Sequence, residues 1–200
     1  MTGWAAFLLT ALLVELTPGP NMAWLAVVAA GEGAGVGLAA VAGVALGLGV
    51  VGVAAALGLA ALVAASPALY EVLRWGGAAY LLWLAWDGWR GAVEEAPPLP
   101  GRAVARAFRR GLVTNLLNPK AGVFYVAVLP GFLPPGDGLL PQTLALTGGY
   151  VAVATGVHAG IVGLAGQARR LLTDPTRERR VRRGLSLALA GVAVWLLWRS

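Results

Sequence analysis

The chain has 200 residues, of which 58% are hydrophobic and only 12% are charged. A soluble domain carries about 25% charged residues, so the composition excludes an ordinary soluble protein and indicates a membrane protein. The chain has no cysteine, which excludes a disulfide scaffold, thiolate metal ligands and a cysteine nucleophile. Its net charge of +6 comes from arginines between apolar runs, a pattern that predicts membrane orientation and no nucleic-acid partner.

Six long apolar segments follow one another along the chain, and an apolar run of this kind is typical of a helix that crosses a lipid bilayer. We therefore expect an all-α protein with six transmembrane helices in a single domain over residues 1–200. In the second segment, Gly43 and Gly47 form a pair of small residues that lets two helix backbones approach closely. A chain with 29 glycines also produces such pairs by composition alone. The six segments cover residues 4–29, 37–65, 68–90, 111–133, 141–166 and 184–199.

Arginines are concentrated in two of the connections between these segments. One group lies between residues 90 and 110, and the other lies between residues 169 and 183. With six spans, both connections fall on the same side of the membrane. Basic connections are typical of the cytoplasmic side, so the pattern predicts that both termini face outward.

The first segment is interrupted in its middle by the sequence ELTPGPNMAW, residues 15–24. Pro18 and Pro20 remove backbone donors and disturb the helical turn, and Gly19 weakens the helix further. Glu15 and Asn21 add polar groups that lipid disfavours. Irregular backbone at membrane depth is tolerated only inside the protein or along a water-filled cavity. The break is therefore predicted to face a cavity, with a simple helix kink as the alternative.

The fourth segment repeats this feature in the sequence TNLLNPKAGVFYVAV. Asn115, Asn118, Pro119 and Lys120 interrupt the apolar run, and Pro119 aligns with Pro20 of the first segment. Because the two segments are three spans apart, they cross the membrane in opposite directions. Corresponding broken helices in two such halves are typical of 3+3 inverted-repeat transporters and mark the binding site. The predicted halves are residues 1–90 and 111–200, joined by a basic cytoplasmic connection at 91–110.

Lys120 and the fifth segment supply further polar groups at membrane depth. Lys120 lies about ten residues beyond the basic connection, or roughly 15 Å along a helix, so a cavity or a carboxylate partner is favoured. In the fifth segment, Thr147, Tyr150 and His158 share one helical face. These three residues and Asn115 either line a pathway or make interhelical hydrogen bonds. His158 is also a candidate proton carrier, because histidine titrates near neutral pH.

Three stretches of the chain resemble the LysE/RhtB family of lysine and homoserine/threonine exporters: TPGPN in the first segment, GAAYLLWLAWDGWRGA in the third and NLLNPKAGVFYVAVLPGF in the fourth. The resemblance extends over essentially the whole chain. It implies a proton-driven exporter of amino acids or related metabolites in the bacterial cytoplasmic (inner) membrane, and it also implies a homodimer. The arginine-rich connection at 169–183 is less typical of the family. The family's conserved elements correspond here to Pro18, Gly19, Pro20, Asn21, Asn118, Pro119 and Lys120, with Glu15 where the family often has an acidic residue.

The same residues predict a substrate site between the first and fourth segments, near mid-membrane. Asn21 and Asn118 would hold the α-carboxylate of a zwitterionic substrate, with Lys120 as its cationic partner. Glu15 would hold the α-ammonium, or pair with Lys120 when the site is empty. Protonation of Glu15 would couple proton entry to substrate release outside.

Other functions have less support in the sequence. The chain has no GxSxG or HExxH motif and a single histidine, so we expect no enzyme activity, no metal site and no cofactor. A metal-ion exporter would use clustered carboxylates, histidines or thiols, and a single glutamate near a lysine does not fit that requirement. An exporter of another small solute, or a passive channel, would share the predicted topology.

Overall fold

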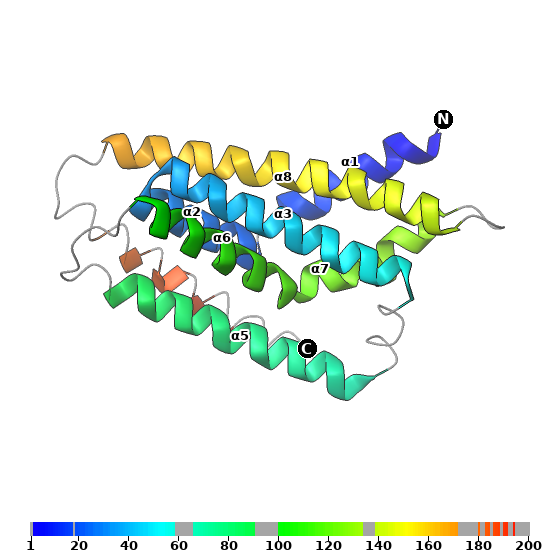
Figure 1. The fold of residues 1–200 in the computed structure, drawn as a ribbon, viewed down its shortest axis with the longest axis horizontal. Helices are drawn as coiled ribbons and strands as arrows, with labels where there is room; N and C mark the ends of the chain where they lie inside the picture. The colour runs from blue at the N-terminus through cyan, green and yellow to red at the C-terminus, as the bar shows by residue number, and fades with distance from the viewer. Residues whose placement is uncertain are drawn as a thin grey trace.

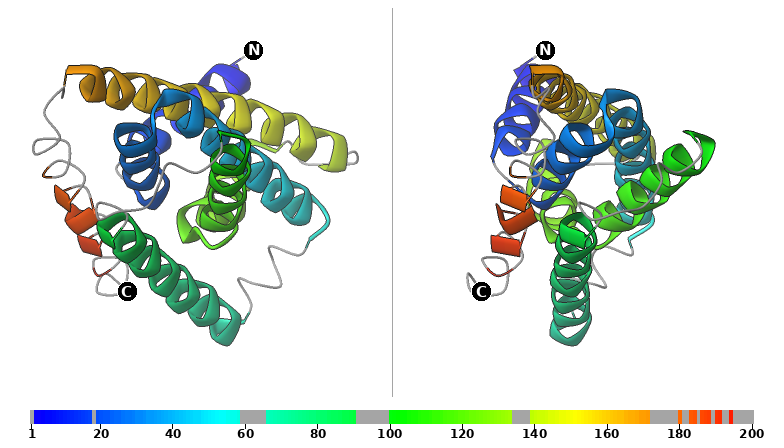
Figure 2. Two further views of the ribbon diagram at one scale, coloured as in Figure 1. Left: turned by 60° about the vertical axis from the view of Figure 1, so that its left-hand side comes forward. Right: turned by 90° about the vertical axis from the view of Figure 1, so that its left-hand side faces the viewer.

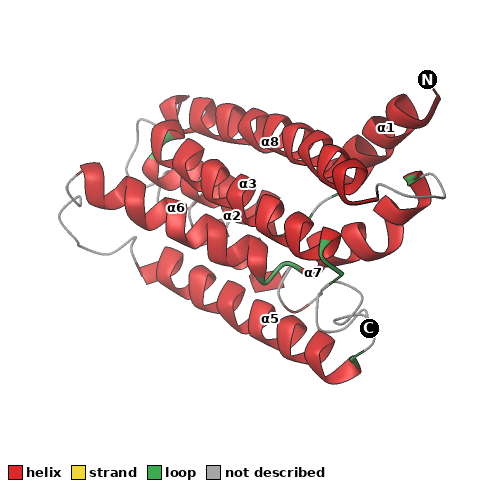
Figure 3. Ribbon diagram, turned by 45° about the vertical axis from the view of Figure 1, so that its right-hand side comes forward, coloured by secondary structure: helices red, strands yellow, loops and turns green. Residues whose placement is uncertain are grey.

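A computed structural model describes residues 2–17, 19–58, 66–90, 100–133 and 139–171, together with residues 180, 183, 184, 186–188, 190, 191 and 194. Every element in this part of the chain is a helix or a helical turn (Figure 3). Most of the helices form an elongated bundle, and the helix of residues 67–90, labelled α5, lies along its side (Figure 1). The elements are α1 (Thr2–Leu16), α2 (Pro20–Glu32), α3 (Ala34–Ala56), α5 (Pro67–Arg90), α6 (Pro100–Leu116), α7 (Pro119–Val123), η1 (Phe124–Val128), η2 (Leu129–Phe132) and α8 (Leu139–Leu171).

The first predicted span is a broken helix. α1 ends at Leu16, α2 begins at Pro20, and the two helices are bent by 62° relative to each other. Pro20 lies in the first turn of α2, where its missing backbone donor would have had no helical partner. Gly19 precedes it in an extended conformation, with φ −159° and ψ 175°. The predicted break in this segment is confirmed.

The fourth predicted span is broken in a similar way. α6 ends at Leu116 and α7 begins at Pro119, with a bend of 52° between the two parts. Pro119 again lies in the first helical turn, and the Asn118 side chain caps this turn by accepting a hydrogen bond from the backbone N–H of Lys120 at 3.0 Å. The chain then continues through a π-helical turn, η1, and a 3-10 turn, η2.

In the described part of the chain, α3 and residues 140–167 of α8 are each long and apolar enough to cross a membrane. Two bent helix pairs meet this condition only if each pair is one span, so length and composition allow two to four spans. α5 forms the helix predicted for the third segment but is not among these spans. Most of the sixth predicted segment lies outside the described residues.

Three boundaries differ from the sequence-based expectation, one of which is the end of α3, at Ala56 and not near residue 65. α6 begins at Pro100 and not near residue 111, so much of the predicted basic connection is helical. Alanine and arginine are strong helix formers and proline suits a first helical turn, which accounts for the extension. α3 is separated from α2 only by Gly33, whose φ of 97° is strained for residues with a side chain.

α3 and α6 cross in direct backbone contact. A Cβ atom at Gly43 would collide with the backbone of Phe108 and Leu112, and one at Gly111 would collide with the carbonyl of Ala40. A Cβ atom at Gly47 would lie 2.9 Å from the Asn115 side chain. The close approach predicted for the Gly43 and Gly47 pair is therefore present, and it places the end of α6 against the middle of α3.

Two apolar clusters form the interior. One joins α2, α3, α5, α6 and α8, and includes Trp24, Leu25 and Val162. The other joins α1, α3, α8 and the chain from α7 to η2, and includes Phe7, Phe124 and Tyr150. α5 reaches the first cluster through Leu81, Leu84 and Ala85, although most of its length lies to one side of the bundle (Figure 2).

Candidate functional site

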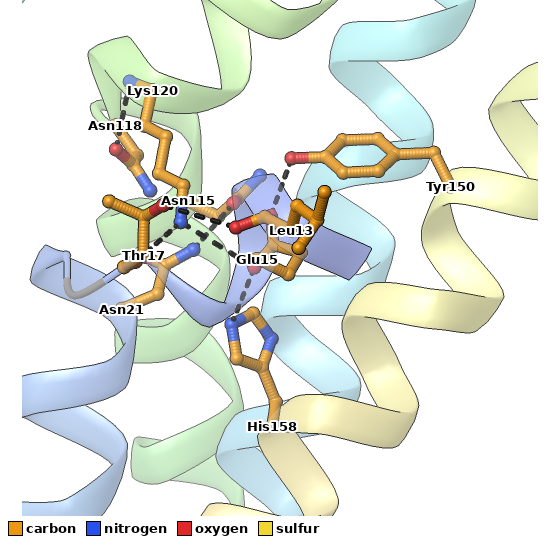
Figure 4. A network of polar contacts seen from close by, with 9 residues as sticks. All are labelled: Leu13, Glu15, Thr17, Asn21, Asn115, Asn118, Lys120, Tyr150 and His158. Carbon is orange, nitrogen blue, oxygen red and sulfur yellow. Dashed lines mark hydrogen bonds and ion pairs between the residues drawn. The ribbon is translucent and has the colours of Figure 1, made fainter. Parts of the chain in front are cut away.

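Glu15 lies on the buried face of α1. Phe7, Ala11 and Glu15 recur at four-residue intervals and are buried, while most of the other described side chains of α1 are exposed. Glu15 is 4% exposed, and the Tyr150 hydroxyl donates a hydrogen bond of 2.6 Å to its Oε1. His158 Nε2 lies 3.3 Å from its Oε2 (Figure 4). Both partners come from the buried face of α8, so the helix face predicted from the sequence meets the predicted carboxylate.

Lys120 approaches the same carboxylate from the second broken helix. Its Nζ donates a hydrogen bond of 2.9 Å to the carbonyl oxygen of Thr17, and lies 4.0 Å from Glu15 Oε2 (Figure 4). The Thr17 carbonyl is available because the chain leaves the α1 helix at that point. The stem of Lys120 covers Gly19, where a Cβ atom would lie 3.5 Å from its Cδ. The pairing expected for Lys120 and Glu15 is therefore present.

Asn21 and Asn115 join the two broken helices directly. Asn21 Nδ2 donates a hydrogen bond of 2.8 Å to Asn115 Oδ1, and both side chains are buried. Asn21 Oδ1 and Asn115 Nδ2 have no hydrogen-bond partner among the described residues. If the oxygen and nitrogen of both amides were exchanged, the hydrogen bond would run in the opposite direction. In either case one amide oxygen and one amide nitrogen of the pair remain without a partner.

The remaining predicted site residues have other positions. Asn118 is buried and caps α7, so in this structure its side-chain oxygen serves the helix. Pro20 and Pro119 begin α2 and α7. Thr147 is buried on α8, and Gly52 of α3 leaves the room that its side chain occupies. Pro18 lies outside the described residues.

Sequence reasoning missed two aromatic residues that hold the site together. The Tyr125 hydroxyl donates a hydrogen bond of 2.9 Å to the carbonyl oxygen of Leu48, which ties η1 to α3. The Phe124 ring stacks on the Tyr150 ring, with 3.7 Å between centroids. Both residues fall within the apolar run of the fourth segment. Only the hydroxyl of Tyr125 distinguishes them in the sequence from residues that simply face lipid or the protein interior.

The contacts define a polar layer, the name used below for Glu15, Asn21, Asn115, Lys120, Tyr150 and His158. On α8, His158 lies one turn from Ala154, which belongs to one apolar cluster, and one turn from Val162, which belongs to the other. The polar layer thus separates two apolar regions at the junction of both broken helices. Broken helices that bring charged groups together inside a bundle of apolar spans are the architecture of a membrane transporter for small solutes.

Comparisons with known proteins agree with this class. The sequence profile described as "LysE type translocator" matches residues 12–200. The homoserine/homoserine lactone efflux protein of Salmonella typhimurium is 33% identical over 178 residues, which cover 88% of this chain and 86% of that protein. An uncharacterized membrane protein of Vibrio cholerae is 33% identical over 180 residues, covering 89% and 88%. The leucine efflux protein of Enterobacter is 34% identical over 130 residues, covering 64% and 62%.

No solved structure matches the chain. The profile match and the similarity to the efflux proteins show that the chain belongs to the LysE family of translocators, in the LysE/RhtB group. It is a membrane protein and a transporter, and not an enzyme.

Proposed function

We propose that the protein is a secondary active transporter that exports an amino acid or a related small metabolite across the cytoplasmic membrane. The observation that carries the proposal is the pair of opposite charges at the junction of the broken helices, with 4.0 Å between Lys120 Nζ and Glu15 Oε2. An amino acid zwitterion offers an ammonium to Glu15 and a carboxylate to Lys120. The relatives named for efflux of homoserine and leucine support this substrate class.

Substrate binding would separate the charge pair. The Glu15 side chain is 5% exposed and the Lys120 side chain is 22% exposed, so Lys120 has more freedom to move. The α-ammonium of the substrate would replace Lys120 Nζ beside Glu15, and Lys120 would turn to the α-carboxylate. The spare donor and acceptor of Asn21 and Asn115 are available for the substrate's other polar groups. Asn118 would support binding indirectly, because it caps the start of α7, the helix that carries Lys120.

Transport would follow from six spans arranged as two inverted halves that rock about the polar layer. The two bends of 62° and 52°, each followed by a proline in the first helical turn, support this arrangement. The protein would act as a homodimer, which the family resemblance supports. In the proposed orientation, the arginine-rich connections face the cytoplasm and both termini face outward.

Protons would drive export through Glu15. When Glu15 is ionised it holds the substrate's ammonium, and when a proton from the outer side neutralises it that attraction is lost. The substrate would then leave to the outside and the proton would return inward with the carrier. A metal-ion exporter is disfavoured, because the Lys120 ammonium beside Glu15 would repel a cation.

Transport by everted membrane vesicles tests the proposal. Vesicles are supplied with a mixed panel of amino acids that includes homoserine, homoserine lactone and leucine, under an imposed proton gradient, and uptake is measured by mass spectrometry. We expect uphill accumulation of one class of compound that is abolished by an uncoupler. Accumulation only to equilibrium would indicate a channel. No uptake in vesicles that contain folded protein would contradict the substrate class.

A further inference from the structure

His158 is a buried titratable residue that the proposed transport cycle does not yet use. It is 1% exposed, and among the described residues its Nδ1 has no hydrogen-bond partner. Its Nε2 lies 3.3 Å from Glu15 Oε2, so the ring is paired with the carboxylate of the polar layer.

The helices around His158 bring very few other titratable groups toward it. α1 contributes Glu15, α3 has no titratable side chain, and the only titratable side chain of α2 is Glu32, which pairs with Arg106 at 2.6 Å. On α8 itself, Tyr150 donates to the other oxygen of Glu15. Lys120 Nζ approaches the same Oε2 of Glu15 at 4.0 Å (Figure 4). Glu15 is therefore the group with which His158 can exchange a proton.

The two α8 residues contact Glu15 at different depths. Tyr150 lies toward the Leu139 end of α8, and His158 lies about 12 Å further toward the Leu171 end. Arg169 and Arg170 are close to that end, next to the connection proposed to be cytoplasmic. His158 thus extends the polar layer from Glu15 in the direction in which the driving proton must travel.

We propose that His158 is the inward proton acceptor of the transport cycle, receiving the proton that Glu15 takes up from the outer side. This inference rests on the proposed proton-coupled export. In the step, the O–H bond of protonated Glu15 breaks and an N–H bond forms at His158 Nε2, which leaves a carboxylate and an imidazolium. The imidazolium then loses one of its two ring protons to water on the cytoplasmic side. Glu15 is thereby ionised again and ready for the next substrate ammonium.

Two transport assays on His158→Gln separate this role from substrate binding. The first measures exchange of labelled for unlabelled substrate at equal pH on both sides, which needs no net proton movement. The second measures uphill uptake driven by a proton gradient. We expect gradient-driven uptake to fall by about tenfold or more beyond any loss of exchange. Gly160→Ala, at an exposed position of α8 with open space around it, is the matched control and should retain both activities.

Gradient-driven uptake by His158→Gln at the wild-type level would overturn the proposal, and so would a loss of exchange equal to the loss of driven uptake. A wild-type protein with neither activity would instead contradict the proposed function itself.

Discussion

Asn21 and Asn115 are hydrogen-bonded at 2.8 Å although 94 positions of sequence separate them. Each residue lies beside the break in its own helix pair, Asn21 in the first turn of α2 and Asn115 in the last turn of α6. The bond therefore ties the two broken helices together at the polar layer. A rearrangement of one half against the other has to stretch or break this contact.

A double-mutant cycle on this pair should show coupling. Asn21→Ala and Asn115→Ala each leave a buried amide without its partner, and the double variant removes both amides. We expect the double variant to be less destabilised than the sum of the single variants, by about 0.6 kcal/mol, the average for interhelical hydrogen bonds in membranes, and by no more than about 1.7 kcal/mol. The free energy of unfolding in bicelles is the measurement. Strictly additive costs would show that the contact contributes nothing.

The α3–α6 crossing should not tolerate a side chain at Gly43. A Cβ atom there meets the backbone of Phe108 and Leu112, which cannot move aside as a flexible side chain can. Gly43→Ala should destabilise the protein by about 1 to 3 kcal/mol, as overpacking does elsewhere. Gly49→Ala on the same helix is the control, because open space surrounds that position. It should be neutral or stabilising by up to about 1 kcal/mol. Equal thermal stability of the two variants would contradict the crossing.

The Tyr150 hydroxyl should matter more for transport than for packing. Tyr150→Phe keeps the ring that stacks on Phe124 and removes the 2.6 Å hydrogen bond to Glu15. A hydrogen bond to a charged group contributes about 1.5 to 3 kcal/mol, so transport should fall about tenfold or more. Tyr125→Phe removes a buried hydroxyl that donates to the carbonyl oxygen of Leu48 and not to Glu15, so transport should fall less than in Tyr150→Phe. Uptake rates in vesicles that contain equal amounts of protein compare the two, and equal rates would contradict a role for the Glu15 contact.

Orientation can be tested with single cysteines, because the chain has none of its own. Gly3→Cys near the start of α1 and Gly101→Cys near the start of α6 both introduce exposed thiols. In right-side-out vesicles, a membrane-impermeant maleimide should label Gly3→Cys directly and Gly101→Cys only after permeabilisation. The reverse pattern would place the termini in the cytoplasm.

Local chemistry made much of this structure predictable. Pro20 and Pro119 mark the starts of α2 and α7, because proline ends one helix and suits the first turn of the next. The buried face of α8 also followed from the helical period, which placed Tyr150 and His158 together.

Relations between helices were harder to predict. Glu15 meets His158 because α1 packs on α8. This packing was not predicted, because the apolar surfaces of the segments are very similar in sequence. The start of α6 at Pro100 was missed because arginines were interpreted only as orientation signals, while their helix propensity extended the helix. The Tyr125 bond to Leu48 was missed because one hydroxyl in an apolar run gives no periodic signal.

The most direct test of the account is proton-driven uptake by everted vesicles that carry Lys120→Ala. This substitution removes the cation proposed to hold the substrate carboxylate and leaves Glu15 without its 4.0 Å partner. With variant protein present in the membrane at the wild-type amount, we predict uptake no higher than in wild-type vesicles treated with an uncoupler. Uptake within about twofold of wild type would contradict the role of Lys120 in substrate binding, and with it the proposed site.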